Sequence, residues 1–173
     1  MELLVFSLLL CGAWAQTSPP PGQDDDNHTG VGVNGVHDDH VEESTECWQT
    51  FNDRSFTLIQ RAITWAQAQQ HCVALGGNLA TIHNQQEEQF VKGVAEGRDA
   101  WIGFSDAQED GVWLWINSKP VTFTGWCDGE PNNSDGPQQC AVINFSADKC
   151  WDDERCLITR PFVCETFDFS APC

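Results

Sequence analysis

Cysteine is the residue type that most limits what this chain can fold into. The 173 residues contain nine cysteines. Cys11 lies in a short apolar stretch near the start, and the other eight follow from Cys47 onward. In a chain that folds in an oxidising compartment, an even number of cysteines favours disulfides over thiol chemistry. The sequence therefore predicts a small domain held together by several bridges.

The beginning of the chain indicates such a compartment. An apolar run from Leu3 to Leu10 precedes Ala13-Trp14-Ala15, a small-x-small pattern typical of signal-peptide cleavage. We expect residues 1–15 to be a secretory signal and the mature protein to be extracellular. The run is too short to span a bilayer, so no membrane association is expected. A lipoprotein signal ending at Cys11 is the less favoured alternative.

Residues 16–46 differ from the rest of the chain. They contain a proline triplet, Asp24-Asp25-Asp26 and the run HDDHVEE, but no lysine, arginine or aromatic residue. Such a segment buries too little apolar surface to offset the entropy lost on ordering. We expect an acidic disordered tail over 16–46 and a globular domain over 47–173. Weak binding of a transition metal by His37 and His40 is the alternative to a solvated linker.

Acidic residues outnumber basic ones. Lysine and arginine total eight against 26 aspartate and glutamate residues, a formal net charge of -18 at pH 7. This charge opposes binding to nucleic acids and anionic membranes, because both are negatively charged themselves. Cations and neutral molecules are the expected partners.

The globular part predicts helices first and strands later. Apolar residues recur at helical spacing over 64–75, and a second helix is expected from Asn84, which precedes Glu87 as in a capping box, to about Val94. Aromatic or alternating segments predict strands at 101–104, 112–115, 140–143 and 162–164. This order predicts an α+β domain. The long connection over 115–140 is typical of a functional loop.

An ordered set of motifs over 47–166 resembles the C-type lectin-like domain. Its members are Trp65…Cys72, Leu75-Gly76-Gly77-Asn78-Leu79-Ala80, Trp101-Ile102-Gly103, Glu130-Pro131-Asn132, Cys140, Trp151-Asp152-Asp153, Cys156 and Phe162-Val163-Cys164-Glu165. The extra cysteines are most similar to those of fish C-type lectins and type II antifreeze proteins. The resemblance implies an α+β domain with two helices, short antiparallel sheets and a long calcium-binding loop.

The resemblance also implies a disulfide pattern. The expected pairs are Cys72–Cys164, Cys140–Cys156 and Cys127–Cys150. Cys47 and Cys173 are left over, and they either pair with each other or cross-link two chains. The longer form of the family carries a cysteine near position 55, where this chain has Ser55, so the partner of Cys47 stays open.

The long loop collects oxygen-bearing side chains that suit calcium, which takes roughly six to eight oxygen ligands. The family pattern places the principal calcium ligands, all but the last of them also sugar contacts, at Glu130, Asn132, Gln138, Asp152 and Asp153. Gln138 stands where the family has Glu and Asp152 where it has Asn, so one lost charge is offset by one gained. The resemblance also implies a cis bond before Pro131.

The family positions of a second calcium site are poorly suited to calcium in this chain. That site is expected to be lost, because neutral side chains dominate its positions: Asp106, Asp110, Asn133, Gln138 and Gln139.

Glycosylation sequons begin at Asn27, Asn132 and Asn144. We expect glycans on Asn27 and Asn144 but not on Asn132, where a glycan would remove a calcium ligand. Five tryptophans are expected in core or loop-anchoring positions: Trp65, Trp101, Trp113, Trp115 and Trp151.

These features predict a secreted lectin that binds mannose-type sugars through calcium, with a role at microbial surfaces in innate defence. Several copies, disulfide-linked or non-covalent, would raise its avidity. An ice-binding protein on the same fold is the main alternative. A solvated loop without a cation, and protein or mineral binding through the acidic tail, are two others. No enzymatic activity is expected, because the acids that would suggest a glycosidase serve better as metal ligands.

Overall fold

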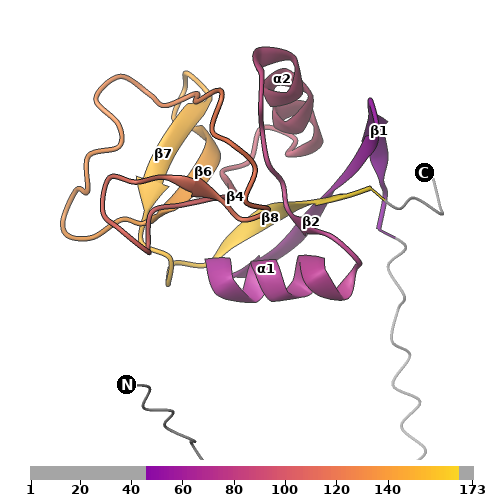
Figure 1. Ribbon diagram of the computed structural model, residues 1–173, viewed down its shortest axis with the longest axis horizontal. Coiled ribbons are helices and arrows are strands. Elements are labelled where there is room, and N and C mark those ends of the chain that lie inside the picture. The colour runs from indigo at the N-terminus through magenta and orange to yellow at the C-terminus, as the bar shows by residue number, and fades with distance from the viewer. Residues whose placement is uncertain (1–45, 168–173) are drawn as a thin grey trace, which may run out of the picture. The chain divides into compact units, whose positions relative to one another are not determined.

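The computed structural model describes residues 46–167. The predicted signal at 1–15, the predicted tail up to residue 45, Asn27 and Cys173 lie outside them. This part of the chain forms two helices and eight strands: β1 (Gln49–Phe51), β2 (Arg54–Ile63), α1 (Trp65–Ala74), β3 (Asn78–Leu79), α2 (Gln85–Val94), β4 (Ala100–Ser105), β5 (Leu114–Trp115), β6 (Cys140–Phe145), β7 (Cys150–Glu154) and β8 (Arg160–Thr166). Figure 1 labels both helices and the longer strands.

The strands form one sheet in the order β1-β2-β8-β4-β6-β7, with β3 added to β8 and β5 added to β4. Neighbouring strands run antiparallel, except that β4 and β8 are parallel where Trp101 meets Phe162. The sheet is therefore mixed, whereas antiparallel pairing alone was expected. α1 packs against β3 and β8, and α2 packs against β1 and β2 (Figure 1). The α+β class is confirmed.

Local sequence sets the ends of α1. The Thr64 side chain accepts a hydrogen bond from the Gln67 N–H, and the Gln67 side chain accepts one from the Thr64 N–H, which closes a capping box. The helix ends at Ala74, Leu75 is its C-cap, and Gly76 follows with a left-handed φ of 84°. The helix predicted over 64–75 is confirmed.

The start of α2 forms half of the predicted box. The Asn84 side chain accepts from the Glu87 N–H at 2.9 Å. The Glu87 carboxylate, however, accepts from the His83 N–H at 2.8 Å instead of from Asn84. The first turn of α2 is capped all the same. Within residues 46–167, neither helix has the length and apolar character needed to cross a membrane.

The interior holds two clusters of buried side chains, one including Val91 of α2 and the other Cys72 of α1. The five tryptophans predicted to be structural are divided between these two clusters. Trp101, Trp115 and Trp151 are buried, and Trp65 and Trp113 are partly buried and pack against the clusters. Trp126 packs edge-on against Trp113, with ring centroids 4.6 Å apart. These aromatic rings support the start of the long loop.

A buried ion-pair network joins β2, α2 and β8. Nη1 of Arg54 lies 2.5 Å from Oε2 of Glu165, and Nη2 lies 2.6 Å from Oε2 of Glu87. Arg54 also donates to the Thr81 carbonyl at 2.9 Å, and the Thr81 N–H donates to Glu165 at 2.9 Å. Glu165 is 1% exposed, so its charge depends on these partners for compensation.

Three disulfides follow the pattern that the family resemblance implies: Cys72–Cys164, Cys127–Cys150 and Cys140–Cys156. The first joins α1 to β8, the second joins the long loop to β7, and the third joins the start of β6 to the turn after β7. Cys47 is also disulfide-bonded. Because Cys173 lies outside the described residues, both the pairing with Cys173 and the cross-link between chains stay predictions.

Candidate metal centre

Three carboxylates meet at the edge of the sheet. Glu130 comes from the long loop, and Asp152 and Asp153 come from β7, the last strand of the sheet. One oxygen from each of the three lies within 4.8 Å of the others. Among the described residues, no lysine or arginine forms an ion pair with any of them. The cluster therefore gathers three acidic side chains that no lysine or arginine of residues 46–167 neutralises by an ion pair.

Asp153 fastens the loop to the sheet. Its side chain is fully buried. Oδ1 accepts from the Asn132 N–H at 2.8 Å, and Oδ2 accepts from the Asn133 N–H at 2.8 Å. Two backbone donors thus hold the carboxylate in one orientation, and each oxygen keeps a lone pair for a further partner.

The Glu130 carboxylate is only partly hydrogen-bonded. Oε1 accepts from Nδ2 of Asn132 at 2.8 Å, but Oε2 is buried and has no hydrogen-bond partner. Burial raises the pKa of Glu130 to about 7, and the neighbouring Asp153 and Asp152 contribute to the rise. Burial also raises the pKa of Asp152. Both shifts have the direction expected where acids are crowded together without a compensating cation.

Gln138 supplies a second acceptor without a partner. The residue is 9% exposed and lies just before β6. Its Oε1 is buried and unpaired, while its Nε2 donates to Oε1 of Glu154 at 3.5 Å. The Gln138 N–H donates to Oδ1 of Asn133 at 2.8 Å. Buried oxygens of this kind normally have a partner.

Asn132 lies beside Glu130 on the exposed side of the loop. Its Oδ1 accepts from the Ser134 N–H at 2.7 Å, so one lone pair of the amide oxygen is used and one remains. The bond between Glu130 and Pro131 is cis, as the resemblance implies. The structure thus brings the three predicted carboxylates together, with Asn132 hydrogen-bonded to one of them.

The positions of the second family site also adjoin one another. Asp106 is buried, with Oδ2 accepting from the Gly111 N–H at 2.8 Å and Oδ1 unpaired. Burial raises the pKa of Asp106. Asn133 donates to Asp110 at 3.2 Å beside a hollow of about 340 Å³ that Gln139 also lines. Only Asp106 and Asp110 bring charge there, and the absence of a second calcium stays a prediction.

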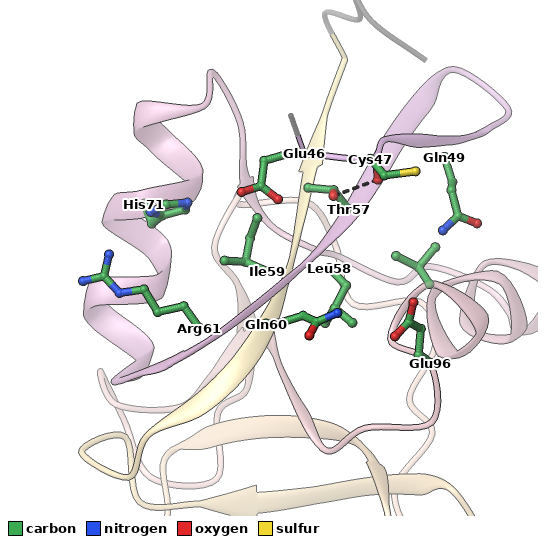
Figure 2. Close-up of a pocket in the computed structure, with 11 residues that line it drawn as sticks. Glu46, Cys47, Gln49, Thr57, Leu58, Ile59, Gln60, Arg61, His71 and Glu96 are labelled. Atoms are coloured by element: carbon green, nitrogen blue, oxygen red, sulfur yellow. Dashed lines mark hydrogen bonds between the residues drawn. The ribbon is translucent and has the colours of Figure 1, made fainter. Parts of the chain in front are cut away.

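A different hollow, of about 570 Å³, lies along β2 and receives none of the predicted calcium ligands. Figure 2 shows Arg61, His71 and Glu96 around it, with the Thr57 hydroxyl donating to the Cys47 carbonyl at 2.8 Å. Its charges are of both signs and do not converge. The carboxylate cluster, rather than this hollow, is the part of the described chain suited to a metal ion.

The pattern along the sequence matches one known family. Residues 61–166 match the family model described as Lectin C-type domain. The chain belongs to the C-type lectin domain family. The match covers the carboxylate cluster, both helices and the paired cysteines from Cys72 to Cys164.

Relatives of this C-type lectin domain include both lectins and antifreeze proteins. Ladderlectin of Oncorhynchus mykiss is 36% identical over 169 residues, covering 90% of this chain and 89% of the relative. The galactose-specific lectin nattectin of Thalassophryne nattereri is 34% identical, covering 68% of this chain and 76% of the relative. The solved structure of herring type II antifreeze protein is similar with a TM-score of 0.66 and 32% identity, covering 69% of this chain and 94% of that one.

Glu154 contacts Gln138 but belongs to none of the motifs visible in the sequence. Strand alternation was the available signal: residues two apart on β7 share a face, so Asp152 and Glu154 point the same way. Recognising this required knowing that 150–154 is a strand, and that strand was not predicted.

The predicted glycosylation sites differ in accessibility. Asn144 is 1% exposed, and its Nδ2 donates to the Lys92 carbonyl at 3.2 Å. Its amide nitrogen is therefore not free in the folded domain, and a glycan there would have to replace this bond. Asn132 is exposed but uses its Nδ2 on Glu130. Neither prediction is tested by these contacts.

Proposed function

We propose that this protein is a calcium-dependent carbohydrate-binding lectin whose cation is held by Glu130, Asn132, Gln138, Asp152 and Asp153. The observation that carries the proposal is the convergence of three carboxylates within 4.8 Å, among them Glu130, whose Oε2 is buried without a partner. Oε1 of Gln138, on the same loop, is also buried without a partner. Hard oxygen donors of this kind are the ligands that calcium prefers. Bound calcium would supply the missing positive charge and coordinate sugar hydroxyls.

The two amide–acid pairs around the cluster support recognition of a sugar. The Glu130 carboxylate can accept a hydrogen bond from a sugar hydroxyl, and the Asn132 amide can donate one to the same hydroxyl. Gln138 with Asp152 offers the same two functions with the amide and the acid exchanged between positions. Charge is conserved by the exchange, so we propose that the site is retained and not decayed.

The proposed ligand is a mannose-type sugar with equatorial 3- and 4-hydroxyls. Glu130-Pro131-Asn132 accompanies that specificity in the family, whereas nattectin is described as galactose-specific. The proposed setting is extracellular, at microbial surfaces, and the proposed activity is binding without catalysis. Multiple copies would compensate for a weak single site.

Calorimetry and a glycan array test this proposal. Titration of calcium into the protein at neutral pH should give a dissociation constant of about 10⁻⁴–10⁻³ M, as in other extracellular calcium modules. The array should show binding of mannose-type glycans in calcium and none in EDTA. Asp153→Asn should abolish both signals, while Asp128→Asn, an exposed loop acid outside the cluster, should change neither. Absence of calcium binding by the parent protein would refute the proposal.

Ice binding is the second candidate, because the herring antifreeze protein shares the fold at 32% identity. A flat surface with few charges would suit ice, and the acidic loop does not provide one. Thermal hysteresis measured with and without chelator separates the two functions: ice shaping without glycan binding would favour the second candidate.

A further inference from the structure

We propose that Glu154 is a positioning residue that holds the side-chain amide of Gln138 with its oxygen toward the cation. This inference rests on the proposed calcium site and names how that site works with glutamine at position 138. It also explains why the exchange at position 138 does not require loss of the site.

A glutamine ligand needs an orienting partner. Its amide has an oxygen at one end and an NH2 group of similar size at the other, and only the oxygen can bind a cation. A carboxylate accepts hydrogen bonds but donates none when ionised, so it selects the NH2 end. Nε2 of Gln138 donates to Oε1 of Glu154 at 3.5 Å, and the Gln138 oxygen lies buried without a partner. The amide is thus held with its acceptor end unused.

Glu154 is itself held in place from two sides. Its Oε2 accepts from Nη2 of Arg160 on β8 at 3.0 Å, and its Oε1 accepts from the Arg155 N–H at 2.9 Å. The Glu154 and Arg160 side chains are 19% and 25% exposed, so solvent only partly screens the pair. Arg160 also faces Asp99 at 3.6 Å. A chain of contacts therefore runs from β8 through Glu154 to Gln138.

The pairing also accounts for the residue type at position 138. A glutamate there would place a second carboxylate against Glu154, with like charges in contact at a partly buried site. Glutamine removes that repulsion and converts the contact into a hydrogen bond. Asp152 and Asp153 both contribute an oxygen to the cluster, whereas Glu154, the next residue of β7, contacts Gln138.

A structural role for Glu154 is the competing explanation, because its pair with Arg160 ties β7 to β8. The two explanations differ in how Glu154 depends on residue 138. If Glu154 only ties the strands together, the effect of removing it does not depend on which residue occupies position 138. A role in orienting an amide disappears when residue 138 has no amide, and the carboxylate of Glu154 then becomes a repulsive neighbour.

A double-mutant cycle on the full-length protein tests this dependence. Calcium affinity is measured by calorimetry for the parent, Glu154→Ala, Gln138→Glu and the double variant, and urea unfolding in EDTA is measured for each. Glu154→Ala should weaken calcium binding at least ten-fold in the parent, the usual size of such an outer-sphere effect, about 10–100-fold. In the Gln138→Glu background the same change should leave the affinity unchanged or raise it. Asp99→Ala, which removes the other partner of Arg160, should leave calcium affinity unchanged in the parent.

The outcomes are distinguishable. An equal loss of affinity in both backgrounds, or a loss of unfolding free energy with unchanged affinity, would overturn the positioning role and leave the calcium site intact. No calcium binding by the parent would overturn the proposed function itself. The expected result is a loss of calcium affinity on Glu154→Ala in the parent and no loss in the Gln138→Glu background.

Discussion

Replacing Arg54 by methionine should remove a large share of the domain's stability. Methionine replaces the apolar stem of the side chain but not the guanidinium, and leaves Glu165, which is 1% exposed, without its cation. Removing one partner of a buried pair costs about 3–5 kcal/mol, because the other charge stays buried and uncompensated. The Thr81 carbonyl also loses a donor at 2.9 Å, which adds about 1 kcal/mol. The total is a substantial part of the roughly 5–15 kcal/mol of a typical domain.

Urea unfolding monitored by tryptophan fluorescence, with the disulfides intact, measures this loss. With a slope of about 2 kcal/mol per molar urea, the midpoint should fall by about 2–3 M. Arg98→Met is the matched control, because Arg98 lies 3.8 Å from Glu96 and both side chains are about half exposed. Exposed pairs of this kind contribute about 0–1 kcal/mol.

A second substitution separates charge from packing. Glu165→Gln in the Arg54→Met background should recover part of the lost stability, because the uncompensated charge is then gone. Burial raises the pKa of Glu165, and Arg54 opposes that rise. Arg54→Met should therefore raise this pKa further, so that the native state of the variant holds the proton more tightly than the parent does. Arg54→Met alone should then gain stability relative to the parent as pH falls. If Arg54→Met costs no more than Arg98→Met, the buried pair does not stabilise the fold as reasoned.

Three further predictions follow from other positions. Gly77→Ala should destabilise the domain by several kcal/mol in urea, because a Cβ would collide with the Glu165 backbone carbonyl, whereas Gly93→Ala in α2 meets nothing and should stabilise it by about 0.5–1 kcal/mol. Burial and Arg54 lower the pKa of His83 below its ordinary 6.5. As the pH falls, the unfolded state therefore binds the proton before the folded state does. Urea unfolding should show the parent losing stability below pH 6.5 and His83→Asn losing less. Calcium at 100 times its dissociation constant should stabilise the parent by about 2.7 kcal/mol in thermal unfolding but not Asp153→Asn, and equal shifts in both would contradict the site.

The helices were predictable because their signals are local. Trp65, Ala68 and Cys72 share one face, and Gly76 stops the helix within a few residues of that pattern. The cap at Asn84 was equally visible. No knowledge of distant segments was needed for either element.

Strands β2 and β7 were not predicted, because their stability depends on distant partners. Arg54 begins β2 as a charged residue, and its burial makes sense only once Glu165 and Glu87 are known to surround it. β7 contains Asp152 and Asp153, which are poor strand formers, and it is held by pairing with β6. The predicted strand at 112–115 shortens to Leu114–Trp115, since the Gly111 N–H turns back to Asp106.

The candidate site was predictable from the family pattern but not from local chemistry. Glu130 and Asp153 are separated by more than twenty residues of sequence, yet Asn132 and Asn133 hydrogen-bond to Asp153 across that separation. Only a known spacing of motifs could join them in advance. The contact between Gln138 and Glu154 depends on the register of β6 against β7, which no motif recorded.

The order of the strands places β1 and the acidic strand β7 at opposite edges of the sheet. β1, which begins the described chain, forms one outer edge of the sheet, and β7, with its two aspartates, forms the other (Figure 1). β8, the last strand along the chain, pairs with β2 and so lies closer to the β1 edge of the sheet than to the β7 edge. A contact made along β1 would therefore leave the acidic edge at β7 uncovered.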